Sequence, residues 1–342
     1  MQVGAISYGK LGRFALAILL GITAASPPAF AWNDEGHMAV AYLAYQRLQP
    51  ATRNRVDALL ALNPYYSRWM AAIPAGTPEA DTKMAIFMIA ATWPDQLRSD
   101  PTYSDDGSNG GNTPAGPEST QNIGYSDHLR HKYWHFIDIP FSQDGTSLPP
   151  VPAPNAQTQI AAFRKTLRSG RPDNVKSYDL AWLEHLEGDV HQPLHAIMRV
   201  SAGMPGGDAG GNLVALCSSP CSESLHLFWD RLVGSQSMLP QSLPPTESNA
   251  QPNLWREIQS ALVAAKALPN ADPHQVQQTK ESVWVRESFD YARRYVYVPP
   301  IGTGAGPFTV SQEYLETARD LAKKRIALAG ARLANLLNNE LR

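Results

Sequence analysis

Residues of the types that bind metal ions are spread from position 37 to position 230 of this chain, and a fold that gathers them into one site is strongly constrained. The densest part is the run His185-Leu-Glu-Gly-Asp189-Val-His-Gln-Pro-Leu-His195. His185 and Asp189 are four residues apart, which puts them on one face of a helix, and His226 and Asp230 repeat this spacing. The further candidates are His37, Asp95 and His135. So many imidazoles and carboxylates predict a site for several divalent ions such as zinc, and multinuclear sites are usually catalytic.

Apolar residues recur at three- and four-residue spacing along most of the chain, which predicts helices. Thr77-Pro78 reads as an N-cap followed by a proline at the first helical position. The predicted helices span 36–48, 52–62, 78–91, 157–168, 176–192, 253–267, 274–297 and 311–338. No segment shows sustained strand alternation, so we expect an all-α, mainly helical fold.

Loop segments rich in Gly, Pro, Ser and Asn separate these helices, at 99–124, 140–156, 203–222, 235–252 and 299–310. None of them marks a domain boundary, because candidate ligands lie on both sides of most of them. We expect one compact domain over residues 32–342, with ample chain for a hydrophobic core.

The first 31 residues have the pattern of a secretory signal peptide. Lys10 and Arg13 form a basic start, residues 14–22 form a short apolar run, and Ala29-Phe-Ala31 is a small-residue cleavage site. Cleavage after Ala31 would leave Trp32 as the first residue, and an uncleaved anchor is the alternative. No later stretch approaches the ~20 apolar residues of a membrane span. We expect a periplasmic or secreted protein in which Cys217 and Cys221 form a small disulfide.

The charge balance indicates no basic nucleic-acid groove. Lys and Arg together number 29 against 31 Asp and Glu, and no basic stripe is present, so phosphate recognition must depend on a local cation. Four other histidines have a structural interpretation, because each lacks a partner at ligand spacing or lies beside a loop; they are His128, His131, His191 and His274.

Motifs surround the candidate ligands in a fixed order. They are Trp32-x4-His37, Trp93-Pro-Asp-Gln-Leu-Arg98, His135-Phe-Ile-Asp138, the run from His185 to His195, Gly210-Gly-Asn212, His226-Leu-Phe-Trp-Asp230, Trp284-Val-Arg-Glu-Ser288 and Gly330-Ala-Arg-Leu-Ala-Asn-Leu-Leu-Asn338. Each motif alone is weak. Together they resemble the S1/P1 family of zinc-dependent nucleases over nearly the whole chain after residue 31, with the bacterial zinc phospholipases C as more distant relatives.

The resemblance implies three Zn²⁺ ions in a cleft of a mostly helical fold. The first ion would be bound by Asp95, His135, His185 and Asp189. The second would be bound by His195, His226 and Asp230. The third would be bound by His37, by Asp189 as a bridge from the first ion, and by the amino nitrogen and carbonyl oxygen of Trp32. A backbone amine can bind a metal only as a free terminus, so removal of the leader would complete the site.

The resemblance also implies roles for residues that bind no metal. Asp138 would orient the attacking water, with a helix-start or supporting role as the alternative. Arg98 would steady the phosphate with its fork of N–H donors, and a surface salt bridge is the alternative. Phe136 would stack on a nucleobase or serve as a buried aromatic. Asn212 would bind substrate beside the two glycines, or the segment would be a plain turn.

The implied activity is hydrolysis of single-stranded DNA and RNA to 5′-nucleotides, together with dephosphorylation of 3′-nucleotides. We expect a monomer without a stable protein partner. Pro94 stands where the family commonly has a small residue, and the loops at 99–124 and 235–252 flank the site, which leaves base and strand preference open. The alternatives are a zinc phospholipase C and a catalytically silent zinc-binding protein. Asp230 and the Asp95/Arg98 pair favour the nuclease over the first, and retention of Asp138 and Arg98 favours it over the second.

Overall fold

The computed structural model describes residues 32–107, 128–217, 223–234 and 250–341. The predicted signal peptide at 1–31 lies outside the described residues, and so do Cys221, most of the 99–124 loop and nearly all of the 235–252 loop. The predicted disulfide therefore stays a prediction.

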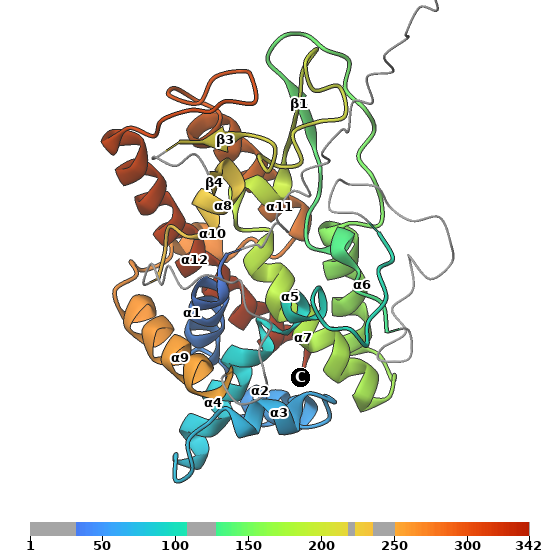
Figure 1. Cartoon of the computed structure of the whole chain (residues 1–342). Helices are drawn as coiled ribbons and strands as arrows, with labels where there is room; N and C mark the ends of the chain where they lie inside the picture. Colours follow the sequence, from blue (N-terminus) through green and yellow to red (C-terminus); the bar gives the residue numbers. More distant parts are fainter. Residues whose placement is uncertain (1–31, 108–127, 218–222, 235–249, 342) are drawn as a thin grey trace, which may run out of the picture.

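Helices are the main elements of the described chain, and strands are few and short (Figure 1). The α-helices are α1 (Asp34–Tyr45), α2 (Pro50–Leu60), α3 (Tyr66–Ala71), α4 (Glu79–Ala90), α5 (Trp93–Leu97), α6 (Ala156–Arg168), α7 (Asp173–Asp189), α8 (Leu225–Asp230), α9 (Ala250–Lys266), α10 (Pro273–Val276), α11 (Glu281–Tyr291) and α12 (Gln312–Glu340). Short 3₁₀ turns lie at η3 (Lys132–Trp134) and η4 (Pro193–Ala196), and a π-helical turn, η5 (Ala292–Val296), follows α11. The predicted mainly helical fold is confirmed.

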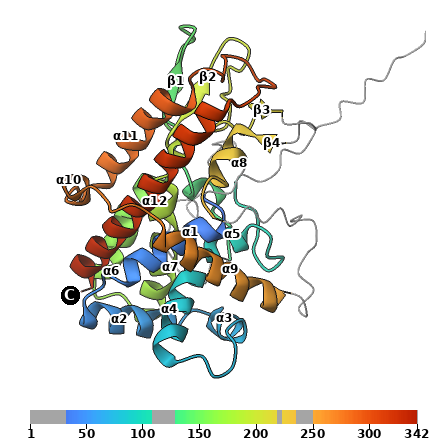
Figure 2. The ribbon, with the colours of Figure 1, turned by 90° about the vertical axis from the view of Figure 1, so that its left-hand side faces the viewer.

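Helix α7 occupies the centre of the molecule. Every residue from Ser177 to Asp189 is buried, which is expected of a helix covered on all sides. It packs against α1, α2, α5, α6 and α12. Helix α12 crosses most of the molecule in Figure 2 and packs on both α1 and α7. The C-terminal end of α7, which carries His185 and Asp189, is therefore held from several directions.

Most predicted helix bounds agree with the structure to within three residues, but the segment 274–297 is not one helix. It is divided into α10, α11 and η5, and residues 277–280 lie between the first two. The carbonyl of Gln275 accepts hydrogen bonds from Arg332, and the carbonyl of Gln278 accepts one from the Trp284 indole. In a continuous helix these carbonyls would accept backbone N–H groups four residues further along the chain. Here they accept hydrogen bonds from side chains of α12 and α11.

Two small sheets occur that the sequence does not predict, and one strand of each lies in a predicted loop. Strand β1 (Pro140–Ser142) pairs in parallel with β2 (Met198–Val200), and β3 (Ala215–Leu216) pairs antiparallel with β4 (Glu223–Ser224). Strands of two or three residues are too short to show an alternating pattern, which is why the sequence did not predict them. The first sheet matters for function because it joins the chain after His135 to the chain after His195.

Large aromatic side chains fill the core around these elements. The fully buried tryptophans include Trp32, Trp93, Trp134, Trp182 and Trp229. Burial of such rings supplies much of the free energy that holds the helices and the candidate ligands in place. Within the described part of the chain, no helix is both long and apolar enough for a membrane span.

Candidate metal centre

Eight predicted metal ligands converge from six segments of the chain. Helix α1 carries His37, α5 carries Asp95, η4 carries His195, and α7 and α8 each carry a histidine–aspartate pair, while His135 directly follows η3. All eight side chains are at most 4 % exposed. Three sets of ligand atoms each lie within 4.8 Å of one another: His37 with Asp95 and His185, His135 with His185 and Asp189, and His195 with His226 and Asp230.

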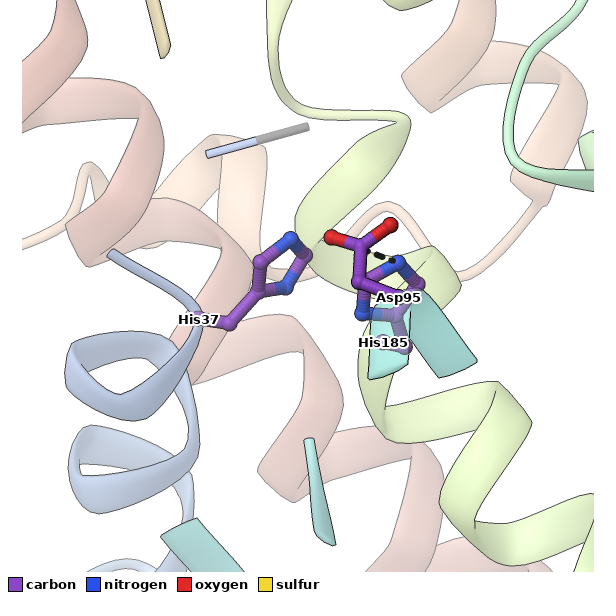
Figure 3. Close-up of side chains that lie close together, drawn as sticks. All are labelled: His37, Asp95 and His185. Carbon is purple, nitrogen blue, oxygen red and sulfur yellow. Dashed lines mark ion pairs between the residues drawn. The ribbon is translucent and has the colours of Figure 1, made fainter. Parts of the chain in front are cut away.

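The first two sets adjoin each other through His185. The His185 Nε2 atom lies 2.8 Å from Nδ1 of His135 and 3.8 Å from Oδ2 of Asp95. The His37 ring stacks on the His185 ring at a centroid distance of 4.0 Å. Figure 3 shows the Asp95 carboxylate and the His37 ring next to the His185 ring. The structure thus brings Asp95 and His185, two of the ligands predicted for the first ion, together with His37, which is predicted for the third ion.

Asp189 presents its two carboxylate oxygens to different neighbours. Its Oδ2 atom lies 3.2 Å from His135 Nδ1 and 3.2 Å from His185 Nε2. Its Oδ1 atom lies 3.3 Å from His37 Nε2 and has no hydrogen-bond partner among the described residues. A carboxylate in this position can serve two cations at once.

The histidines of the third set, at the predicted second ion, face each other with unprotonated nitrogens. Nδ1 of His195 lies 2.8 Å from the His135 carbonyl, and Nδ1 of His226 lies 2.7 Å from the Gly210 carbonyl. A nitrogen that faces a carbonyl must donate its proton, so in each neutral ring Nε2 carries only a lone pair. These two Nε2 atoms are 3.0 Å apart. Two lone pairs at this distance repel unless a cation lies against both, so the donor set fits a metal ion.

The aspartate of this set is oriented by a neighbour. Gln192 donates its side-chain amide to Asp230 Oδ1 at 2.7 Å, while Asp230 Oδ2 is buried without a hydrogen-bond partner in the described chain, 3.7 Å from His226 Nε2. Outer-shell hydrogen bonds of this kind fix the direction of a ligand. Gln192 is a functional candidate that the sequence did not reveal, because nothing in its spacing indicates the contact with Asp230.

The charges around His185 and Asp189 favour binding of a cation. Burial raises the pKa of Asp189, but His185, His135 and His37 together lower it well below its usual range. Burial lowers the pKa of His185, yet Asp189 and Asp95 raise it to about 9. The acids are therefore anionic, and without a metal a proton is retained on His185. A divalent ion would replace that proton, as in other metal sites.

Trp32 lies between the clusters. Its indole Nε1 donates to the Gly188 carbonyl at 3.0 Å, and the N–H of Asn33 donates to the Asp230 carbonyl at 3.0 Å. The two bonds attach this end of the described chain to α7 and α8, the two helices that each carry a histidine–aspartate pair. This position is compatible with the predicted role of Trp32, which stays a prediction.

Asp138 lies in the chain between two backbone hydrogen bonds that join the residues before β1 to the η4–β2 segment. The N–H of Ile137 donates to the His195 carbonyl at 2.8 Å, and that of Met198 donates to the Ile139 carbonyl at 2.9 Å. Asp138 is only 6 % exposed, and burial, with the charge of Asp208, raises its pKa to about 7. A carboxyl with such a pKa can exchange protons near neutral pH.

Arg98 is buried next to a ligand. Its Nε atom lies 3.5 Å from Asp95 Oδ1, and 8 % of the residue is exposed. The alternative of a surface salt bridge is therefore wrong. Phe136 is half-buried and packs against the hydrophobic core, so one part of its surface stays accessible.

The predicted substrate residue Asn212 takes part in a tight turn. Its side-chain amide donates to the Ala209 carbonyl at 2.7 Å. Gly210 and Gly211 precede it with φ of +59° and +84°, which glycine adopts without strain. The turn interpretation is thus correct for this segment, but Gly210 also orients His226 through its carbonyl.

The other histidines take no part in the ligand sets. The His191 ring bonds the Glu187 carbonyl and Arg332, and the His131 ring lies 2.8 Å from Asp106 and stacks on Trp134. His128 lies beside the Tyr103 ring, and His274 is exposed on α10.

Fold and site together define a class: mainly helical proteins whose buried histidines and aspartates can hold several metal ions. The model of the S1/P1 Nuclease family matches residues 32–342, and the chain belongs to this family. Similar proteins from Arabidopsis thaliana are Endonuclease 3, 24% identical over 332 residues (95% of this chain, 94% of the relative), and Endonuclease 1, 24% identical over 326 residues (90% and 86%). Endonuclease 5 is 28% identical over 180 residues (50% and 54%). The chain is a hydrolase of a metal-dependent nuclease family, and nucleic acid is its substrate class.

Proposed function

We propose that this protein is a zinc-dependent phosphodiesterase that hydrolyses single-stranded DNA and RNA to 5′-nucleotides and dephosphorylates 3′-nucleotides. The observation that carries the proposal is the position of Asp189, which presents one carboxylate oxygen to each of two adjoining ligand clusters. A single structural zinc site would be closed by four ligands and would need no such bridge.

Three Zn²⁺ ions would occupy the centre. Asp95, His135, His185 and Asp189 would hold the first, His195, His226 and Asp230 the second, and His37, Asp189 and the backbone of Trp32 the third. When bound, the ions supply Lewis acidity at the phosphate oxygens and lower the pKa of nearby water. Imidazole and carboxylate ligands together suit a divalent ion such as zinc.

The residues of the chain then direct the reaction. As water attacks phosphorus, Asp138 accepts the proton of that water, for which its buried carboxyl is suited by its raised pKa. The bond between phosphorus and the 3′ oxygen breaks, and the leaving 3′ oxygen takes up a proton from solvent. Arg98 donates to the non-bridging phosphate oxygens and offsets the charge that develops on them. Its contact with Asp95 keeps the guanidinium next to a ligand proposed for the first ion.

Substrate selection would depend on whether a base is free to stack, and not on which base it is. Phe136 offers a partly exposed ring directly after the ligand His135, and stacking on an aromatic ring accepts any base. A stacked base must first leave a duplex, which favours single strands. With a net charge of −2, attraction for the phosphate backbone would depend on the bound ions.

Assembly would depend on export. Removal of residues 1–31 would free the Trp32 amine for the third ion, and an oxidising compartment would permit the Cys217–Cys221 disulfide. We propose a periplasmic or secreted monomer on this basis.

The test is an assay of purified protein that begins at Trp32, with and without a chelator. Single-stranded DNA, RNA, a 3′-nucleotide and phosphatidylcholine are offered separately, and products are separated by chromatography. Chelator-sensitive release of 5′-nucleotides, restored by zinc, is the expected result. Hydrolysis of lipid alone would identify a phospholipase C, and zinc binding without any hydrolysis would identify a silent binding protein. The exposed Asp144→Asn variant serves as a control that should match the wild type.

A further inference from the structure

Asp208 is a buried aspartate outside the predicted ligand sets, and its carboxylate joins three separate segments. Oδ1 accepts the backbone N–H of Arg199 on β2 at 2.9 Å, and Oδ2 accepts the Tyr297 hydroxyl at 2.8 Å. The backbone N–H of Gly211 also donates to this carboxylate. Asp208 itself is 0 % exposed. One side chain therefore ties β2, the turn at 208–213 and the chain after η5 to one another.

The turn that Asp208 holds positions the candidate ligand His226. The Asp208 carbonyl accepts the N–H of Leu213 at 3.1 Å, and within this turn the Gly210 carbonyl bonds Nδ1 of His226 at 2.7 Å. A Cβ at Gly210 would lie 2.7 Å from the Leu194 carbonyl, so the turn has little room to shift. The position of the turn consequently sets the direction in which His226 Nε2 points.

The charge of Asp208 also acts on Asp138. The parallel pairing of Pro140 with Met198 places the chain around Asp138 next to the start of β2. The charged and titratable groups around Asp208 itself are Arg199, with Nε 3.5 Å from Oδ2, and Tyr297. Burial raises the pKa of Asp208, and the Arg199 and Tyr297 donors oppose that rise.

We propose that Asp208 is a positioning residue that holds the Gly210–Asn212 turn against His226 and at the same time presents a buried negative charge to Asp138. The proposal rests on the proposed function, since it concerns a ligand and the proton acceptor of that reaction. Through one carboxylate, the binding of one metal ion and the protonation of the water-orienting acid become linked.

The test compares Asp208→Ala, Asp208→Asn, Tyr297→Phe and the control Asp144→Asn. Asp144 is matched because it also caps a turn next to the β1–β2 sheet, through Ser142, Thr146 and Ala202, but it is exposed. Zinc affinity is measured by competition with a chromophoric chelator, and kcat/KM is followed against pH at saturating zinc. Circular dichroism checks the fold of each variant.

Asp208→Ala should weaken one of three zinc ions by roughly 10- to 100-fold, as loss of an outer-shell partner does elsewhere, and leave the other two unchanged. Asp208→Asn should move the acid limb of the pH profile at least about half a unit to lower pH, because a like charge next to Asp138 is removed. Tyr297→Phe, which keeps the charge, should weaken the same ion only about 5-fold.

Two failures can be told apart. A wild type that binds three zinc ions and cleaves single-stranded DNA, with Asp208 variants that match Asp144→Asn in zinc affinity and pH profile, would overturn the role of Asp208 alone. A uniform loss of activity without a change in zinc affinity or in the acid limb would also overturn it. A wild type without zinc binding or cleavage would overturn the proposed function, and this inference with it.

Discussion

At the scale of single residues, Asp138 connects the structure most directly to the chemistry. Burial and the charge of Asp208 raise its pKa to about 7. The deprotonated carboxylate is the form that can accept a proton from water, so activity should be lost as pH falls through this pKa. Bound cations would stabilise the anion and lower the value, which places the acid limb at or below about pH 7.

Asp138→Asn should therefore lower kcat by about 10²- to 10⁴-fold, since the amide accepts no proton, while zinc content stays that of the wild type. The acid limb assigned to Asp138 should disappear from the remaining activity. Steady-state kinetics between pH 4 and pH 9, with metal analysis of the same preparations, provide the measurement. A variant that keeps most of its kcat would show that another group accepts the proton.

At the scale of secondary structure, the sequence predicted correctly which candidate ligands share one face of a helix. The ligands His185 and Asp189 share a face of α7, and a spacing of four residues states this directly. Gln192 and Asp208 act through distant segments that come into contact only after folding, so no local pattern indicates them. The strands were missed because they are too short to show alternation, and the break between α10 and α11 because it depends on contacts with Arg332 of α12.

The packing of α1 on α7 gives a prediction for Gly188. A Cβ at this position would lie 2.7 Å from Nδ1 of the ligand His37, so alanine must push α1 or the His37 ring away. Gly188→Ala should cost about 1–3 kcal/mol of unfolding free energy and reduce zinc content, despite the better helix propensity of alanine. Gly170→Ala, where no atom lies within 4 Å, is the matched control. Equal melting temperatures and zinc contents for the two variants would contradict this packing.

At the scale of the whole molecule, the candidate metal centre is assembled from segments between residue 37 and residue 230, and α7 is its central support. The one-domain arrangement could be predicted because the ligands lie on both sides of the loops. The sequence could not reveal how tightly Trp32 is attached to the ligand helices, because that depends on the bonds to Gly188 and from Asn33 to Asp230.

Protein that begins at Trp32 should bind three zinc ions. A variant with Gly-Ser placed before Trp32 should bind two, because the amine is converted to an amide, and its kcat/KM should fall at least about tenfold. The same two residues added after Arg342 form the control. Mass spectrometry of the N-terminus accompanies the zinc and activity measurements, and full activity of the N-terminally extended protein would argue against the backbone ligand.

The bridge formed by Asp189 is the central claim, and the zinc content of two variants tests it most directly. Asp95 is assigned to the first ion only, whereas Asp189 is assigned to the first and the third, so native mass spectrometry at fixed free zinc should find three ions in the wild type. It should find two in Asp95→Asn and one in Asp189→Asn, provided circular dichroism shows that both variants are folded. Two or three zinc ions in folded Asp189→Asn would contradict the account.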